Sequence, residues 1–315
     1  MEERLARRDP RAVARAISLV ENGGPAQAEL VARLARSVGR ARVVGVTGPP
    51  GAGKSTLVDR LAQTLRARGS TVGILCVDPT SPFSGGALLG DRIRMSAIAT
   101  DPGIFIRSMA TRGAMGGLAR ATRDAADVLD AAGFDWVLIE TVGVGQDEVD
   151  VVSAVDSVLV VAVPGLGDDI QAIKAGVLEI ADVFVLNKAD RDGADRVVRD
   201  LQMMLSLGEH GAWVPPIVRT VAMRGEGVVE LLEAVDRHHL HLTASGELAR
   251  RRREQLRLRV ETILKERVLA EVRSEGELAR AVEAGFAARV DPYTVAGQLF
   301  EEVVRQARHR AAGGS

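Results

Sequence analysis

The sequence predicts an α/β fold: a mainly parallel, doubly wound sheet with helical segments before and after it. Three observations support this fold class. Short apolar runs alternate with helical stretches from residue 42 onward, as is typical of parallel strands buried on both faces. A glycine-rich octet directly follows the first run, and strand-like runs stop after about residue 240. The expected strands are residues 42–47, 71–77, 104–108, 135–141, 157–163, 182–187 and 216–222.

Helices are expected on both sides of the sheet region. Residues 1–40 are rich in Ala, Arg and Leu at helical spacing, and Gly23-Gly24-Pro25 divides them into two expected helices. Residues 247–273 predict one long helix, and Asp291-Pro292, a cap followed by Pro, begins another over 292–310. The long helix has an apolar stripe formed by Leu256, Val260, Ile263, Leu264, Val268 and Val272.

Composition excludes several classes of protein. The 315 residues are 46% hydrophobic, which is ample for a large core. The 41 basic and 42 acidic side chains nearly cancel, so no nucleic-acid partner is expected. The single cysteine, Cys76, cannot form an internal disulfide, and no run approaches the roughly 18 apolar residues of a membrane span. We therefore expect a cytoplasmic protein that does not bind a membrane.

The octet at residues 48–55, GPPGAGKS, has the pattern of a phosphate-binding loop. Its glycines let backbone N–H groups turn toward phosphate oxygens, and the following helix adds its dipole. Lys54 supplies positive charge near the β- and γ-phosphates, and the Ser55 hydroxyl can bind Mg²⁺. A glycine-rich turn without a ligand is the alternative, but the order of strand, loop and helix favours a nucleotide. The expected contacts are Gly48, Pro50, Gly51, Ala52, Gly53, Lys54, Ser55 and Thr56.

A second motif, Asn187-Lys188-Ala189-Asp190, follows an expected strand and has the N-K-x-D pattern that reads guanine. The Asp190 carboxylate can accept from N1–H and the 2-amino group of guanine, and adenine would leave it unpaired. Asn187 can meet the other edge of the base, and the Lys188 stem can cover its face. The alternative is a polar turn before a helix at 193–207. A weaker signal is Ala222, in the position of a small loop that contacts the guanine O6.

Acidic residues lie on the phosphate side of the expected site. Asp78 and Glu140 end strands, where ligands bind in open α/β sheets, and Asp91 follows in a glycine-rich stretch. Glu140 with Gly143 three residues later is the arrangement that senses a γ-phosphate. Val144 stands where Ras-like enzymes carry a water-orienting glutamine, so slow intrinsic hydrolysis is expected. For each acid taken singly, a helix cap or a surface charge is the alternative.

Two other clusters are interpreted as unrelated to the site. The histidines at 238, 239 and 241 are expected to be exposed and solvated rather than bound to a metal. The basic run at residues 250–253 spreads around a helix and is expected to form a solvated face or a partner contact.

Four stretches, GPPGAGKSTL, VDPTSPFSGGALLGDRIRM, ETVGVGQDE and VLNKAD, together resemble the MeaB/ArgK family of P-loop GTPases. The resemblance covers nearly the whole chain. It implies a helical extension over 1–40, a GTP-binding P-loop domain over 41–242 and a helical dimerisation arm over 243–315. By position, it implies catalytic roles for Lys54, Asp91 and Glu140, metal-side roles for Ser55, Asp78, Asp91 and Glu140, a phosphate contact at Gly143, and base contacts from Asn187, Lys188, Asp190 and Ala222.

The resemblance also implies a function. The family hydrolyses GTP with Mg²⁺, forms homodimers, gates cofactor loading of an adenosylcobalamin-dependent acyl-CoA mutase and protects that mutase. The partner is a mutase of the methylmalonyl-CoA type, with isobutyryl- and 2-hydroxyisobutyryl-CoA mutases left open. One alternative is a nickel-inserting GTPase, against which the lone Cys76 and the short histidine cluster argue. Another is a nucleotide-dependent kinase of an amino-acid transport system, although no protein-kinase site is evident.

Overall fold

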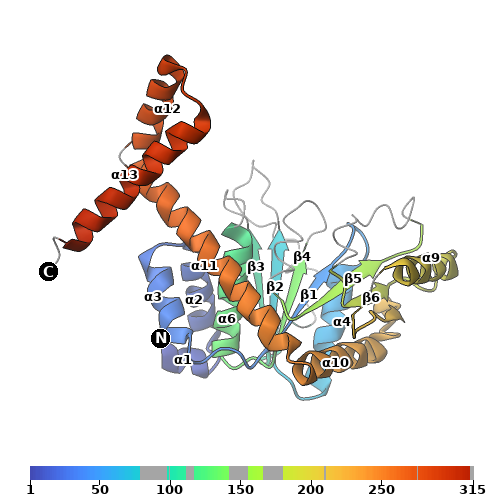
Figure 1. The fold of residues 1–315 in the computed structure, drawn as a ribbon. Helices are drawn as coiled ribbons and strands as arrows, with labels where there is room; N and C mark the ends of the chain where they lie inside the picture. Colours follow the sequence, from blue (N-terminus) through green and yellow to red (C-terminus); the bar gives the residue numbers. More distant parts are fainter. Residues whose placement is uncertain are drawn as a thin grey trace. The chain divides into compact units, whose positions relative to one another are not determined.

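The computed structural model describes residues 1–78, 98, 100–110, 117–141, 155–165, 180–208, 211–274 and 276–312. The chain divides into two compact units, Met1–Arg252 and Arg253–Ser315. The first unit contains the sheet and the helices around it, and the described part of the second unit is helical (Figure 1). The phosphate loop and the guanine motif therefore belong to the same unit.

In the described part of the first unit, seven strands form one sheet in the order β3-β2-β4-β1-β5-β6-β7. Every neighbouring pair is parallel. Each strand overlaps the run expected for it, so the predicted α/β fold class is confirmed. The strands are β1 (Arg42–Thr47), β2 (Val72–Asp78), β3 (Ile104–Ala110), β4 (Trp136–Thr141), β5 (Ser157–Ala162), β6 (Val183–Leu186) and β7 (Ile217–Arg219).

Helices cover both faces of this sheet (Figure 1). One buried apolar layer includes α2 (Pro10–Asn22), α3 (Pro25–Leu34), α6 (Gly117–Ala131) and α9 (Ala194–Leu207), and the other includes α4 (Lys54–Ala67) and α10 (Val228–Ala244). Every residue of β4, β5 and β6 is buried. Burial on both faces explains why these strands are continuous apolar runs in the sequence.

The N-terminal segment forms three helices, not the two expected, because α1 (Glu2–Ala6) is separate from α2. The break lies at Asp9-Pro10. The Asp9 carboxylate accepts hydrogen bonds from the N–H groups of Arg11 (2.9 Å) and Ala12 (3.0 Å), and Pro10 takes the first helical position. The same Asp-Pro signal begins a helix at residue 291, so the sequence contained the information for this break.

The compact units divide the chain differently from the three segments expected. Helices α2 and α3 pack against α6, which groups residues 1–40 with the sheet. The first unit extends to Arg252, inside the long helix α11 (Glu247–Ser274). In the second unit, α12 (Glu277–Ala288) and α13 (Pro292–Ala312) pack on each other. Helix α12 was not expected, although Leu278, Val282 and Phe286 have helical spacing.

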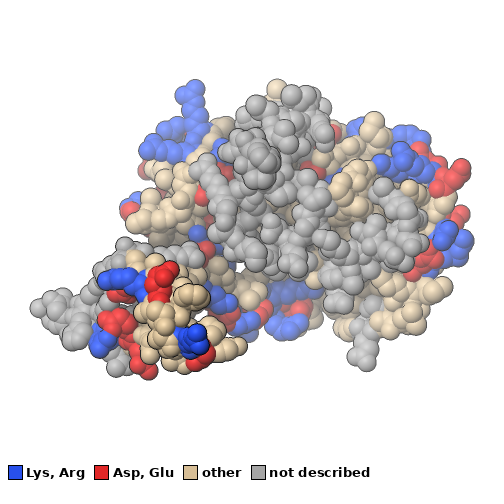
Figure 2. Space-filling model, turned by 90° about the horizontal axis from the view of Figure 1, so that it is seen from above, with Lys and Arg blue, Asp and Glu red and all other residues tan. Residues whose placement is uncertain are grey.

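The described surface is mixed in charge. On the face shown in Figure 2, basic and acidic side chains of the described residues are interspersed, in keeping with 41 basic and 42 acidic residues in the chain. No described helix combines the length and the apolar character that crossing a membrane requires.

The start of α11 is anchored at the amino ends of β5 and β6, which corrects the expectation of a solvated basic run. Arg251 binds both carboxylate oxygens of Asp182 at 2.9 Å, and Arg252 binds Asp156 at 2.8 and 3.0 Å. Both aspartates are almost fully buried. Asp182 also accepts a hydrogen bond from the N–H of Val158 at 2.9 Å. The interpretation of the run as solvated was therefore wrong for Arg251 and Arg252.

His238 belongs to the same network, so the expectation that it is exposed was also wrong. Its side chain is 0% exposed. Nδ1 lies 2.8 Å from the Ser157 hydroxyl, and Nε2 lies 3.2 Å from the Asp182 carboxylate. The Trp213 ring packs on this imidazole, with ring centroids 4.8 Å apart. Burial raises the pKa of Asp182, but the bonds from His238 and Arg251 outweigh it, so the pKa lies below its ordinary value.

We expect Asp182→Asn to lower the free energy of unfolding by about 3 kcal/mol at pH 7, because Arg251 and His238 lose a buried negative partner. Asp195→Asn is the matched control: it removes an exposed pair with Arg219 and should cost less than about 1 kcal/mol. Denaturant titration measures both values. Equal unfolding free energies for wild type and Asp182→Asn would contradict the stabilising role.

The same pair of proteins tests the pH dependence. Because the folded pKa of Asp182 is below the unfolded one, its stabilisation is present above about pH 4 and is lost as pH falls toward the folded value. The difference in unfolding free energy between wild type and Asp182→Asn should therefore narrow below about pH 4.

Candidate nucleotide site

The candidate site lies at the carboxyl edge of the parallel sheet. The phosphate loop follows β1, Glu140 is near the end of β4, Asn187 follows β6, and Ala222 lies in a short 3₁₀ turn, η1 (Ala222–Arg224), after β7. Because the strands are parallel, these segments meet at one edge, which is where ligands bind in open α/β sheets. The structure thus brings together motifs that are about 130 residues apart in the sequence.

The phosphate loop leads directly into α4. Gly53 has a left-handed conformation with φ of 86°, and the helix begins at Lys54. Lys54 is only 5% exposed, and its ammonium donates to the backbone carbonyls of Gly48 (2.7 Å) and Pro49 (3.1 Å). The positive charge is therefore held against the loop, next to the N–H groups of a helix N-terminus that favour an anion.

Two of the expected metal-side residues are in contact. The Ser55 hydroxyl donates to Glu140 Oε1 at 2.5 Å, and Glu140 is 7% exposed. A hydroxyl and a carboxylate are the hard oxygen donors that Mg²⁺ prefers, so this pair fits the ion. The backbone of Asp78 ends β2 beside β4, but its side chain lies outside the described atoms. Asp91 and Gly143 lie outside the described residues.

Asn187 connects the base side to the phosphate side. Its side chain is buried, and its Nδ2 donates to the carbonyl of Ala52 in the phosphate loop at 2.8 Å. Its Oδ1 accepts from the Thr220 hydroxyl at 3.2 Å and from the N–H of Ala222 at 3.1 Å. The Ala222 N–H, which is expected to meet the guanine O6, thus already donates to Asn187 in this structure. A bound guanine would share this donor with Asn187 or replace Asn187 as its acceptor.

The other two residues of the motif lie at the open side of the site. Lys188 has a positive φ of 55°, a conformation that costs energy for a residue with a Cβ, and its ammonium donates to the Gly51 carbonyl at 2.6 Å. The Asp190 carboxylate is 39% exposed and lies 3.4 Å from the guanidinium of Arg224. The carboxylate that is expected to read the base is therefore accessible, with the guanidinium of Arg224 beside it.

Sequence reasoning missed three residues of this site. Thr220 and Arg224 flank the loop at Ala222, and Arg60 on α4 donates to the carbonyls of Ala222 and Met223. The position of Thr220, two residues before the small loop, was an available signal. Nothing in the local sequence distinguishes Arg60 or Arg224 from ordinary surface arginines.

We expect Gly53→Ala to weaken nucleotide binding about tenfold more than Gly51→Ala. A Cβ at Gly53 would lie 2.6 Å from Asn187 Nδ2, whereas one at Gly51 meets nothing within 4 Å. Displacing Asn187 breaks its buried hydrogen bonds, and about 1.4 kcal/mol corresponds to tenfold. Both glycines have positive φ, so the backbone strain of roughly 1–2 kcal/mol is common to both variants. Titration with a fluorescent GDP analogue measures the affinities, and an equal loss in both variants would contradict the contact.

Comparisons with known proteins agree with this geometry. Residues 13–277 match a family described as methylmalonyl-CoA mutase-associated GTPase MeaB. A Pyrococcus horikoshii protein, provisionally named a GTPase, is 50% identical over 307 residues, covering 96% of this chain and 97% of that one. GTPase ArgK of Escherichia coli is 36% identical over 261 residues, covering 80% and 79%. A crystal structure titled LAO/AO transport system kinase has a TM-score of 0.73 at 28% identity, covering 96% of each chain. The chain therefore belongs to the MeaB family of mutase-associated GTPases and is a GTP hydrolase.

Proposed function

We propose that this GTPase acts with Mg²⁺ as a nucleotide-dependent switch on an adenosylcobalamin-dependent acyl-CoA mutase of the methylmalonyl-CoA type. In this role it gates the loading of the mutase's cofactor and protects the mutase from inactivation. The observation that supports the nucleotide part best is the bond from Asn187 to Ala52, which joins the guanine motif to the phosphate loop. The family description over residues 13–277 supports the mutase part.

Base selection rests on Asp190 and the loop at Ala222. The Asp190 carboxylate accepts from N1–H and the 2-amino group of guanine, and O6 would share the N–H of Ala222 with Asn187. Adenine would present no donor at N1 and would leave the carboxylate unpaired, which is costly in a site built for hydrogen bonding. Asn187 holds both loops in place, and the Lys188 stem lies over the face of the base.

On the phosphate side, Lys54 neutralises charge on the β- and γ-phosphates, and the backbone N–H groups of residues 51–56 surround their oxygens. Ser55 and Glu140 would hold Mg²⁺, together with Asp78 and Asp91. Bound Mg²⁺ supplies further positive charge at the phosphates. The Gly143 N–H meets the γ-phosphate. Glu140 accepts a hydrogen bond from the hydroxyl of Ser55, which lies in the first turn of the helix that follows the phosphate loop. Glu140 can therefore respond to the presence of that phosphate.

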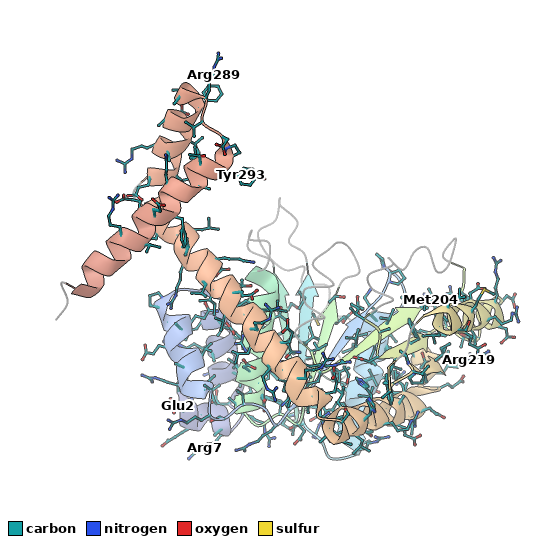
Figure 3. All side chains as sticks on the ribbon, viewed as in Figure 1. Glu2, Arg7, Met204, Arg219, Arg289 and Tyr293 are labelled. Carbon is teal, nitrogen blue, oxygen red and sulfur yellow. The ribbon has the colours of Figure 1, made fainter. Side chains whose placement is uncertain are left out.

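We also propose that the protein is a homodimer joined through residues of the second unit. Three of the nine aromatic side chains (six Phe, two Trp and one Tyr) are exposed on the α12–α13 hairpin. Tyr293 is 89% exposed and lies, like Arg289, at the turn of this hairpin (Figure 3). Large apolar side chains exposed in this unit are Leu256, Leu258, Val260, Leu264, Leu269, Val282, Phe286, Val290, Tyr293 and Phe300. Exposed large apolar side chains gathered in one unit are typical of protein interfaces, and a two-fold contact is the commonest geometry.

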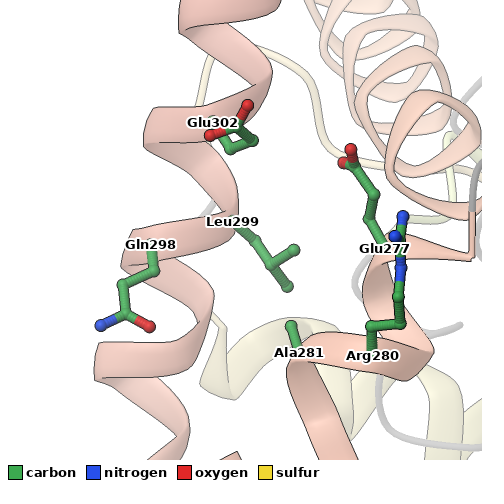
Figure 4. A pocket seen from close by; sticks show the side chains of 6 residues that line it. All are labelled: Glu277, Arg280, Ala281, Gln298, Leu299 and Glu302. Atoms are coloured by element: carbon green, nitrogen blue, oxygen red, sulfur yellow. The ribbon is translucent and has the colours of Figure 1, made fainter. Parts of the chain in front are cut away.

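The hairpin also has an open pocket between α12 and α13. Ala281 and Leu299 line its apolar part, and Glu277, Arg280, Gln298 and Glu302 line the rest (Figure 4). An apolar centre with a charged rim is the usual composition of an interface.

We expect the full chain to scatter light as a dimer, with twice the 33.4 kDa mass of one chain. Leu264→Glu should weaken that dimer at least about tenfold, since it puts a charge on an apolar residue that is 56% exposed in the single chain. Lys265→Glu, an exposed neighbour on the same helix, is the matched control and should leave the dimer intact. A wild-type monomer at micromolar concentration would remove the dimer from the proposal.

The switch is tested by linkage. If the mutase binds the GTP-bound protein more tightly than the GDP-bound one, it must raise GTP affinity by the same factor. We expect purified methylmalonyl-CoA mutase to raise affinity for a non-hydrolysable GTP analogue about fivefold or more relative to GDP. An acyl-CoA enzyme that does not use cobalamin is the control. Unchanged affinities for both nucleotides would contradict the switch while leaving the GTPase assignment intact.

A further inference from the structure

Arg60 links the helix that begins at the phosphate loop to the loop expected to read the base. It lies on α4, six residues after Lys54. Its Nε donates to the carbonyl of Ala222 at 3.1 Å, and a terminal nitrogen donates to the carbonyl of Met223 at 2.9 Å. These are two successive backbone carbonyls of η1, so one guanidinium fixes the planes of two adjacent peptides.

Arg60 is itself held in place. Its other terminal nitrogen donates to Gln63 Oε1 at 3.1 Å, and Gln63 Nε2 donates to Asp59 Oδ2 at 2.9 Å. All three residues lie on α4 and are half-buried. The planar guanidinium therefore approaches η1 in one orientation, and a flexible ammonium would not reproduce both bonds.

Ala222 is consequently held from both sides. Its N–H donates to Asn187, and its carbonyl accepts from Arg60. The Arg60 bonds hold the two peptides that follow Ala222, and they therefore fix the position of its Cα, to which the N–H nitrogen is attached. Arg60 touches neither the phosphate loop's carbonyls nor Glu140 in the described contacts, so its effect is confined to the base end of the site.

We propose that Arg60 is a positioning residue for guanine recognition, because it fixes the Ala222 N–H that meets O6. The strength of the contact with O6 then depends on the position of α4, from which Arg60 reaches η1. This inference rests on the proposed contact between Ala222 and O6. Because no bond of Arg60 among the described residues reaches the γ-phosphate side, its loss lowers GTP and GDP affinity by the same factor and raises KM without changing kcat.

The test compares diphosphates that differ at one position of the base, with the full chain. GDP and 6-thio-GDP differ at atom 6 only, and GDP and IDP differ in the 2-amino group that Asp190 contacts. Wild type should prefer GDP to 6-thio-GDP by roughly three- to tenfold, the value of one hydrogen bond. Arg60→Ala should reduce this preference to less than about twofold and leave the GDP/IDP ratio unchanged. Arg60→Lys, which can reach one carbonyl, should restore part of it.

Arg66→Ala is the matched control. Arg66 lies on the same helix and is also half-buried, but it binds Asp101 and the Ser70 carbonyl, away from η1. Both ratios should stay at their wild-type values in this variant, and thermal unfolding establishes that each variant is folded.

The possible results separate the two proposals. A wild-type GDP/6-thio-GDP ratio in folded Arg60→Ala overturns the role of Arg60 and leaves the guanine site standing. A fall of both ratios together also overturns it, because that result indicates general loosening. If wild type prefers GDP to IDP but binds GDP and 6-thio-GDP equally, the O6 contact itself is wrong, and the role of Arg60 falls with it.

Discussion

The nucleotide site depends on one buried amide. The side chain of Asn187 bonds to the phosphate loop at Ala52 and to the base loop at Thr220 and Ala222, so three segments distant in sequence share one set of hydrogen bonds. Removing the amide would leave buried donors and acceptors without partners, which costs more than the bonds themselves contribute. The phosphate and base ends of the site therefore have a fixed spacing before nucleotide arrives, and binding does not have to create it.

The carboxyl edge of the sheet holds residues of the nucleotide site, and the amino edge holds the ion pairs with α11. Strand β6 contributes to both edges. Asn187 follows β6 at the carboxyl edge, and Asp182 precedes it at the amino edge, only five positions earlier. Asp182 binds Arg251 and His238, and Asp156 at the start of β5 binds Arg252. Two buried aspartates with adjacent arginine partners hold the first turn of α11 against the amino edge of the sheet. Removing one partner of such a pair leaves an uncompensated buried charge, so the aspartates and arginines depend on each other.

The sequence was most informative where chemistry is local. The phosphate loop, the N-K-x-D motif and the seven strands could be predicted because each is a short pattern of residues adjacent in the chain. The interactions that join those patterns could not. Arg251 lies 69 positions from Asp182, and Arg60 lies 162 positions from Ala222. A buried histidine and an exposed one look alike in a run of three, and only tertiary packing made His238 part of the core.

Helix boundaries were only partly predicted, although the local sequence contains signals for them. Asp291-Pro292 predicts the start of a helix, whereas the identical pair at Asp9-Pro10 was not used, and only the break at residues 23–25 was expected in that segment. The roles of the site residues toward nucleotide and metal remain predictions, and for Asp78, Asp91 and Gly143 the described atoms do not include the groups on which those roles depend.

Cys76 has a consequence for experiments. It is the only cysteine in the chain, it is 3% exposed, and in β2 it stands opposite Glu140 of β4. A thiol reagent needs access to the sulfur, so alkylation requires the buried apolar layer over this face of the sheet to open. Each molecule gains one mass increment when Cys76 is alkylated, so the alkylation rate reports how often the structure opens at this residue. A nucleotide that binds only the folded state slows that alkylation in proportion to its occupancy. The alkylation rate of the native thiol, measured by mass spectrometry, therefore reports the fraction of protein that has nucleotide bound, and no dye has to be introduced.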